Sequence, residues 1–132
     1  NVVSELMRPD SAAGVVAWVD QFPADQVFIT AVTAAELMYG VAWLPNGRRK
    51  QTLVAKVRDL IGVDFEDQVL PFTAAAAAQY AEIVASRERL GRPISMADAQ
   101  IAAICRQHDL HLGTRNAKDF ADVGIRVLNP WA

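Results

Sequence analysis

The spacing of apolar residues along the chain alternates between a helical period and the pattern of buried strands. In the stretch from 12 to 22, for example, Val15, Trp18, Val19 and Phe22 recur at helical spacing. Together with caps and helix breakers, this pattern predicts helices over residues 1–8, 12–22, 33–44, 48–62, 73–90 and 95–108, with a short helical piece near 117–122. Runs rich in β-branched and aromatic residues predict strands over residues 26–32, 68–72, 110–114 and 125–130.

The order of these elements predicts the fold class. Strands that alternate with helices indicate an α/β fold, with a parallel sheet covered by helices on both faces. The visible strands are few for such a sheet. The chain has 132 residues and no linker rich in Gly, Ser or Pro, which predicts one domain over residues 1–132.

Composition narrows the class of protein without identifying a function. A hydrophobic fraction of 52% excludes a disordered chain, and no stretch has the roughly 20 consecutive apolar residues that a membrane span needs. The single cysteine, Cys105, rules out an internal disulfide and fits a cytoplasmic protein. A net charge of −2 argues against a general nucleic-acid binder, although the basic run GRRK (47–50) could form a local patch or a solvated loop.

One carboxylate stands out in the helix predicted from 95 to 108. Asp98 is the only charge in ISMADAQIAAIC (94–105) and shares a helical face with Ile101, Ala102 and Cys105. The ordinary explanation is a capping box in which Ser95 is the N-cap and Asp98 the N3 residue. A carboxylate in the first turn also interacts favourably with the helix dipole, by about 0.3–1 kcal/mol. Capping alone could therefore account for Asp98.

A second isolated acid makes a functional interpretation stronger. Glu36 is the sole charge between Val27 and Gly47 and follows the strand predicted at 26–32. We expect Thr33 and Glu36 to form another capping box, with apolar neighbours on the same face of the helix. Ionised carboxylates are almost never fully buried unless they are paired or bound to a cation.

These two acids predict a metal site at the sheet edge. In open α/β sheets, ligands bind beyond the carboxyl ends of the strands, where the following helices begin. Two carboxylates in a dry site repel each other, and a hard divalent cation with oxygen ligands relieves that repulsion. The stretch GTRNAKDF (113–120) adds oxygen atoms from Thr114, Asn116 and Asp119. A simple polar turn with Asn116 or Asp119 as a helix cap is the alternative.

In order and spacing, these residues resemble the PIN-domain ribonucleases, and more narrowly toxins of the VapC and FitB type. The resemblance is carried by fragments spread over nearly the whole chain: NVVSELMR, TAAEL, SMADAQIAA, LGTRNAKDF and VLNPW. It implies a PIN fold, with a central parallel sheet of about five strands and helices on both sides. It also implies cleavage of RNA that depends on Mg²⁺ or Mn²⁺, and inhibition by a cognate antitoxin.

The resemblance also implies a role for each candidate residue. By position, Glu36 and Asp98 correspond to the second and third acids of the family, which bind the metal. Asn116 falls where several relatives have a fourth acid, and Asp119 is the alternative source of that carboxylate. Thr114 is expected to orient a metal-bound water or a phosphate.

The family pattern begins before this sequence does. Its first acid, and the strand that carries it, precede the position of Asn1, so we expect the native protein to have a few more N-terminal residues. Arg115, Arg48 and Arg49 are candidates for holding the RNA backbone. Aromatic residues on the helices at 12–22 and 33–44 are core residues or, alternatively, a surface for an antitoxin helix or a homodimer.

Two other functions are compatible with parts of the pattern. A receiver-like signalling domain has similar length and a Mg²⁺-binding acid cluster, but its acids lie at strand ends and it needs a lysine after the last strand. A PIN-like module that binds nucleic acid or an antitoxin without cleaving is the second alternative, because Asn116 stands where an acid is expected. RNA cleavage would separate this module from a nuclease.

Overall fold

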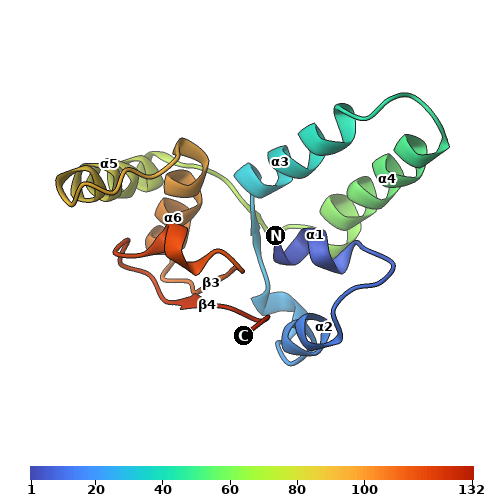
Figure 1. The fold of residues 1–132 in the computed structure, drawn as a ribbon, viewed down its shortest axis with the longest axis horizontal. Coiled ribbons are helices and arrows are strands. Elements are labelled where there is room, and N and C mark those ends of the chain that lie inside the picture. The colour runs from blue at the N-terminus through green and yellow to red at the C-terminus, as the bar shows by residue number, and fades with distance from the viewer. The chain divides into compact units, whose positions relative to one another are not determined.

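The computed structural model describes residues 1–132, and its elements are drawn in Figure 1. The chain forms two compact units. One consists of Phe22–Pro71, and the other combines Asn1–Gln21 with Phe72–Ala132. The predicted helices and strands are present in these units, and the strands are shorter than predicted. None of the helices has the length and apolar character needed to cross a membrane.

The Phe22–Pro71 unit is built on two helices and one parallel strand pair. Its elements in chain order are η1 (Ala24–Gln26), β1 (Ile29–Thr30), α3 (Ala31–Ala42), α4 (Arg48–Asp59), the π-helical turn η2 (Leu60–Asp64) and β2 (Val69–Leu70). β1 pairs with β2 in register Ile29 with Val69 and Thr30 with Leu70. The helices α3 and α4 pack on each other, and Ile29, Val41 and Val57 are buried.

Helix α3 begins earlier than the sequence predicts. Thr30 is its N-cap, and the Thr30 side chain accepts the backbone N–H of Thr33 at 3.0 Å. The expected capping box of Thr33 and Glu36 is therefore wrong, because Glu36 is the sixth helical residue and lies in the second turn. Two threonines three positions apart can both cap, and the strand that ends at Thr30 determines which one does.

The second unit holds the longest helices of the chain. Its elements are α1 (Val2–Leu6), α2 (Ala13–Asp20), α5 (Ala74–Arg89), α6 (Met96–His108), β3 (Leu112–Gly113), η3 (Ala117–Phe120) and β4 (Val127–Leu128). α5 and α6 make the most extensive helix contact, and β3 pairs in parallel with β4. The core is centred on α6, where Ala99 and every residue from Ile101 to Cys105 are buried.

Close packing of α2 on β3 depends on a glycine. A Cβ atom added to Gly113 would lie 2.7 Å from the Trp18 ring, closer than real contacts allow. Only glycine therefore fits at this point of β3 without movement of the indole. This contact holds the strand that leads directly into Thr114.

The single sheet of about five strands is not confirmed. The structure has four strands, and they form two separate parallel pairs, β1–β2 and β3–β4. Each strand has two residues, whereas the runs of β-branched and aromatic residues predicted longer ones. Strand length depends on neighbouring strands that satisfy backbone groups, and each strand here has one partner.

Candidate functional site

Asp98 occupies the position that the sequence predicts. It is the third residue of α6, and the Ser95 hydroxyl oxygen accepts the Asp98 backbone N–H at 3.2 Å. The expected positions of Ser95 as N-cap and of Asp98 as the N3 residue are therefore confirmed. No strand precedes α6, since the segment before Ser95 is the turn that follows α5. Ala99 and Ala102 beside it are fully buried, whereas Asp98 itself is half-buried.

The surroundings of Asp98 favour its neutral form. Burial raises the pKa of this carboxyl above its ordinary value, and the nearby Asp119 raises it further. A hydrogen bond with the Ser95 side chain and the positive charge of Arg87 act in the opposite direction. The pKa is raised overall because burial and Asp119 outweigh the Ser95 hydrogen bond and the charge of Arg87. A bound cation would favour the ionised form of this carboxyl.

Thr114 and Asn116 form a tight turn directly after β3. Thr114 is 5% exposed, and its hydroxyl oxygen accepts the Asn116 backbone N–H at 3.1 Å. The same hydroxyl donates to the Asn1 side-chain carbonyl at 3.4 Å, and the Arg115 N–H donates to that carbonyl at 3.1 Å. The chain start is thereby fastened to the turn, and the Thr114 hydroxyl has a structural role of its own.

Asp119 is the candidate residue whose charge acts on Asp98. It belongs to η3, and its backbone N–H donates to the Asn116 carbonyl at 3.0 Å. Asn116 stands at the N-cap position of η3 but makes no side-chain cap bond. Asp119 and Asn116 are both exposed, and Asp119 is the one whose charge acts on Asp98. Asp119 as the source of the fourth carboxylate stays a prediction, and the action of its charge on Asp98 is the observation in its favour.

Glu36 lies in the Phe22–Pro71 unit, on the second turn of α3. Its expected apolar surroundings are wrong, because Glu36 is exposed and its neighbours Tyr39 and Trp43 are 62% and 78% exposed. An exposed carboxylate needs no bound cation, so the local surroundings of Glu36 do not indicate a metal site. The candidate role of Glu36 rests on the family pattern and not on the local packing of α3.

The acids beside α6 fit a hard divalent ion. No group of three His, Cys, Asp or Glu side chains gathers anywhere in the structure. Mg²⁺ does not require such a cage, since it is usually held by one or two carboxylates and keeps several waters. Asp98 and Asp119 supply two oxygen-donor side chains in one unit, and the negative charge of Asp119 acts on Asp98. The residues present thus match the chemistry of such an ion.

The arginines expected to hold RNA have different surroundings. Arg115 is exposed, and its guanidinium lies 5.4 Å from the centre of the Trp131 ring, a distance typical of a cation–π contact. Arg48 and Arg49 are exposed in the first turn of α4. The neighbouring Lys50 donates to the Ala42 carbonyl at the end of α3, so it has a structural partner.

Sequence reasoning missed one charged residue of this region. Arg87 is 6% exposed, and it is the most deeply buried basic residue of the chain. It follows Ala76 and Ile83 on the buried face of α5 at helical spacing. An arginine at a position that helical spacing assigns to the buried face of α5 is the feature from which the sequence could have predicted it.

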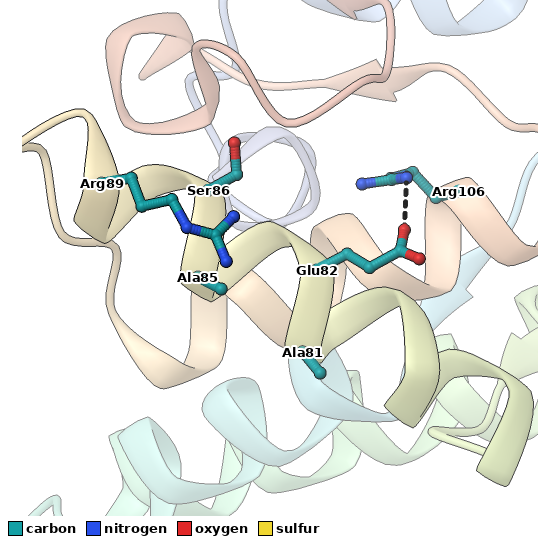
Figure 2. Close-up of a pocket in the computed structure, with 6 residues that line it drawn as sticks. All are labelled: Ala81, Glu82, Ala85, Ser86, Arg89 and Arg106. Atoms are coloured by element: carbon teal, nitrogen blue, oxygen red, sulfur yellow. Dashed lines mark hydrogen bonds and ion pairs between the residues drawn. The ribbon is translucent and has the colours of Figure 1, made fainter.

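A shallow hollow of about 520 Å³ lies over α5 and α6 in the same unit. Figure 2 shows Glu82 and Arg106 facing each other across it, joined by an ion pair at 3.1 Å, with Arg89 on the same side of α5. Ser86 and two alanines complete its lining. None of the candidate acids lines this hollow, so it is separate from the site at Asp98.

Comparison with known proteins identifies the family and the fold. The PIN domain family matches residues 1–125. The chain is 40% identical to Toxin FitB of Neisseria gonorrhoeae and 32% identical to VapC ribonuclease Y4jK of Sinorhizobium fredii, covering 99% of this chain and 94% of each relative. A structure of FitAB bound to a DNA fragment superposes with a TM-score of 0.93 at 38% identity, over 100% of this chain and 92% of that one.

The family match and the fold likeness define an α/β protein of the PIN type. The chain belongs to the PIN domain family. Within that family it is similar to the toxins of FitAB and VapBC toxin–antitoxin systems, as the resemblance predicts.

Proposed function

We propose that this chain is the toxin of a type II toxin–antitoxin pair and acts as a metal-dependent endoribonuclease that hydrolyses RNA phosphodiester bonds. The observation that carries the proposal is the half-buried Asp98 carboxylate, with Asp119 acting on it, at the start of α6. The match to the PIN domain family spans both units, which supports their action as one domain. A relative named as a VapC ribonuclease supports the reaction class.

Each residue contributes a separate task in this mechanism. Asp98 and Glu36 would hold Mg²⁺ or Mn²⁺ as the metal ligands. When bound, such an ion lowers the pKa of a coordinated water and stabilises charge on the phosphate. Asp119 adds negative charge beside Asp98, and Glu36 can also orient the attacking water. Thr114, through its turn with Asn116, positions the segment that leads to Asp119.

RNA contacts are expected from exposed basic residues. Arg48 and Arg49 are exposed at the start of α4 and can meet backbone phosphates without losing a structural bond. Arg115 already contacts Trp131, so its guanidinium is held in one place and presents a fixed positive charge. Such contacts make binding fall steeply with salt, because each phosphate contact releases counterions.

The expected protein partner is a cognate antitoxin. One similar solved structure is FitAB bound to a DNA fragment, and another is a member of the VapBC family of toxin-antitoxin systems. On α3, Met38, Tyr39 and Trp43 are 51%, 62% and 78% exposed, which is unusual for large apolar side chains. We infer that this exposed face of α3 contacts an antitoxin helix or a second copy of the chain, as a homodimer. The alternative that Met38, Tyr39 and Trp43 belong to the hydrophobic core is wrong, because all three are exposed.

A PIN-like module that binds RNA or an antitoxin without cleaving remains the second candidate function, favoured by Asn116 at an acid position. The receiver-like alternative is wrong, because the chain belongs to the PIN domain family.

Cleavage of defined RNA separates the two remaining functions. The purified protein is incubated with labelled RNA in Mg²⁺ or Mn²⁺, in parallel with EDTA and with the Asp98→Asn variant. We expect cleavage only for the unchanged chain with metal, and a loss of about 100-fold or more in the variant. RNA binding without turnover would instead support the non-cleaving module. Undiminished cleavage by Asp98→Asn would exclude Asp98 from the mechanism.

A further inference from the structure

Arg87 is a buried cation close to the candidate acids, and the mechanism above does not use it. It lies in the last turn of α5, and only 6% of the residue is exposed. An isolated charge this deeply buried carries a large desolvation penalty unless it is well hydrogen-bonded. The partners that meet this requirement all belong to segments that follow α5 in the chain.

The Arg87 guanidinium donates to three backbone carbonyls. Its Nε donates to the Arg92 carbonyl at 2.7 Å. Its Nη1 donates to the carbonyls of Asp119 and Ala121, each at 3.0 Å. Carbonyls at the end of a helix lack intrahelical partners, and Arg87 satisfies two of them at the end of η3. Arg87 thereby joins α5 to the segment that carries Asp119.

A second link holds the same segment at its surface. The Arg92 guanidinium forms an ion pair with the Asp122 carboxylate, and both side chains are about half-exposed. Arg92 also offers its carbonyl to Arg87, so the turn after α5 is fastened to residues 119–122 from two sides. The buried link has fixed geometry, whereas the surface link is open to solvent and weaker.

We propose that Arg87 is a positioning residue of the nuclease site, which fixes η3 so that the Asp119 carboxylate is held beside Asp98. This inference rests on the proposed function and deepens it. Two hydrogen bonds from the Arg87 guanidinium, to the carbonyls of Asp119 and Ala121, determine the place of this segment more tightly than a single contact could.

The test compares Arg87→Lys, which keeps the charge but loses the planar fork, with Arg89→Gln as a matched control. Arg89 lies two positions further along α5, is exposed, and lines the hollow of Figure 2, to which none of the candidate acids contributes. RNA cleavage is measured as separate kcat and KM values at a temperature well below the unfolding midpoint of each variant. We expect Arg87→Lys to lower kcat about tenfold or more with little change in KM, as supporting residues of metal sites do. Arg89→Gln should leave kcat unchanged.

A double-mutant cycle separates positioning from general stability. If Arg87 acts through Asp119, then Arg87→Lys combined with Asp119→Asn lowers kcat no further than Asp119→Asn alone. Additive losses, or a full kcat in folded Arg87→Lys, would overturn the inference. Asp122→Asn serves as a second probe if Arg87→Lys does not fold, since Asp122 is exposed and asparagine tolerates its positive φ of 59°.

We expect Asp122→Asn to lower kcat about threefold and to show the same lack of additivity with Asp119→Asn. An unchanged kcat in Asp122→Asn, when Arg87→Lys is unfolded, counts against the inference. Failure of the proposed function is distinguishable, because the unchanged chain and Arg89→Gln would then also fail to cleave RNA.

Discussion

The hydroxyl oxygen of Ser95 accepts the backbone N–H of Asp98 at 3.2 Å. Asp98 is thus both a helix-start residue and the candidate metal ligand, so the two interpretations of this acid are compatible. The cap fixes where the carboxylate lies at the start of α6. Partial burial and the neighbouring Asp119 then determine its charge.

The first prediction concerns the pH dependence of stability through Asp98. Its pKa is higher in the folded protein than in the unfolded chain, so the folded state binds the proton more tightly between those two pKa values. The free energy of unfolding should therefore fall as the pH rises through this window and stay lower above it. Asp98→Asn lacks this titration. In EDTA, we expect the stability of the unchanged chain relative to this variant to decrease from about pH 3.5 to about pH 7.

Urea unfolding of both proteins at the two pH values measures this difference. Adding Mn²⁺ near neutral pH should stabilise the unchanged chain and not Asp98→Asn, because binding to the folded state adds to stability. A difference that stays constant with pH would contradict the raised pKa of Asp98. Equal stabilisation of both proteins by Mn²⁺ would place the ion elsewhere.

The second prediction decides between Asp119 and Asn116 as the source of the fourth functional side chain. Asp119 acts on Asp98, whereas the Asn116 side chain makes no cap bond at η3. We expect Asp119→Asn to lower kcat for RNA cleavage about tenfold to 100-fold, the range found for groups that support a metal ligand. Asn116→Ala should change kcat less than threefold by the same comparison. A larger loss of kcat in Asn116→Ala than in Asp119→Asn would instead assign the fourth functional side chain to Asn116.

The third prediction tests which threonine caps α3. Thr30 is 7% exposed and accepts the Thr33 N–H, so Thr30→Val removes the acceptor while keeping nearly the same shape. The variant should lose about 1 kcal/mol in the free energy of unfolding. Thr33→Val is the matched control and should cost less, because the Thr33 hydroxyl bonds only the Thr30 side chain. Denaturant titration of both variants measures the difference, and an equal loss would contradict the assigned cap.

The fourth prediction uses the salt dependence of RNA binding. Arg48 and Arg49 are exposed, whereas Lys50 is bonded to the Ala42 carbonyl. The double variant Arg48→Gln/Arg49→Gln should reduce the slope of log K against log salt by about 1.4, since each contact to single-stranded RNA contributes about 0.7. Binding of labelled RNA by Asp98→Asn at several salt concentrations measures the slope without cleavage. Lys50→Gln is expected to leave it unchanged, and an unaltered slope in the double variant would exclude both arginines.

The fifth prediction concerns Cys105. Burial raises the pKa of this thiol from 9.0 to about 11, and the residue is 5% exposed. Two pKa units lower the reactive thiolate fraction about 100-fold near neutral pH. Ellman's reagent should therefore react at least about 100-fold more slowly with the folded protein than with the chain in denaturant. Rapid reaction under native conditions would show that the end of α6 opens readily.

Local sequence signals predicted the helices and the cap at Asp98 well. Helical periodicity and capping act over a few residues, so they can be recognised without knowledge of the tertiary fold. The start of α3 was predicted incorrectly because Thr30 and Thr33 carry the same local signal, and the end of β1 decides between them. Strand lengths were overestimated for a similar reason, since partners distant in sequence determine where a ladder ends.

The sequence by itself therefore determined the order of elements, the family motifs and the presence of Asp98 in the first turn of α6. Only the tertiary structure decided which charges act on that acid. Arg87 shows the physical reason, because it bonds carbonyls 32 and 34 residues further along the chain. Burial and Coulomb interactions depend on distance in space, and no local pattern of residue types records which distant segments meet.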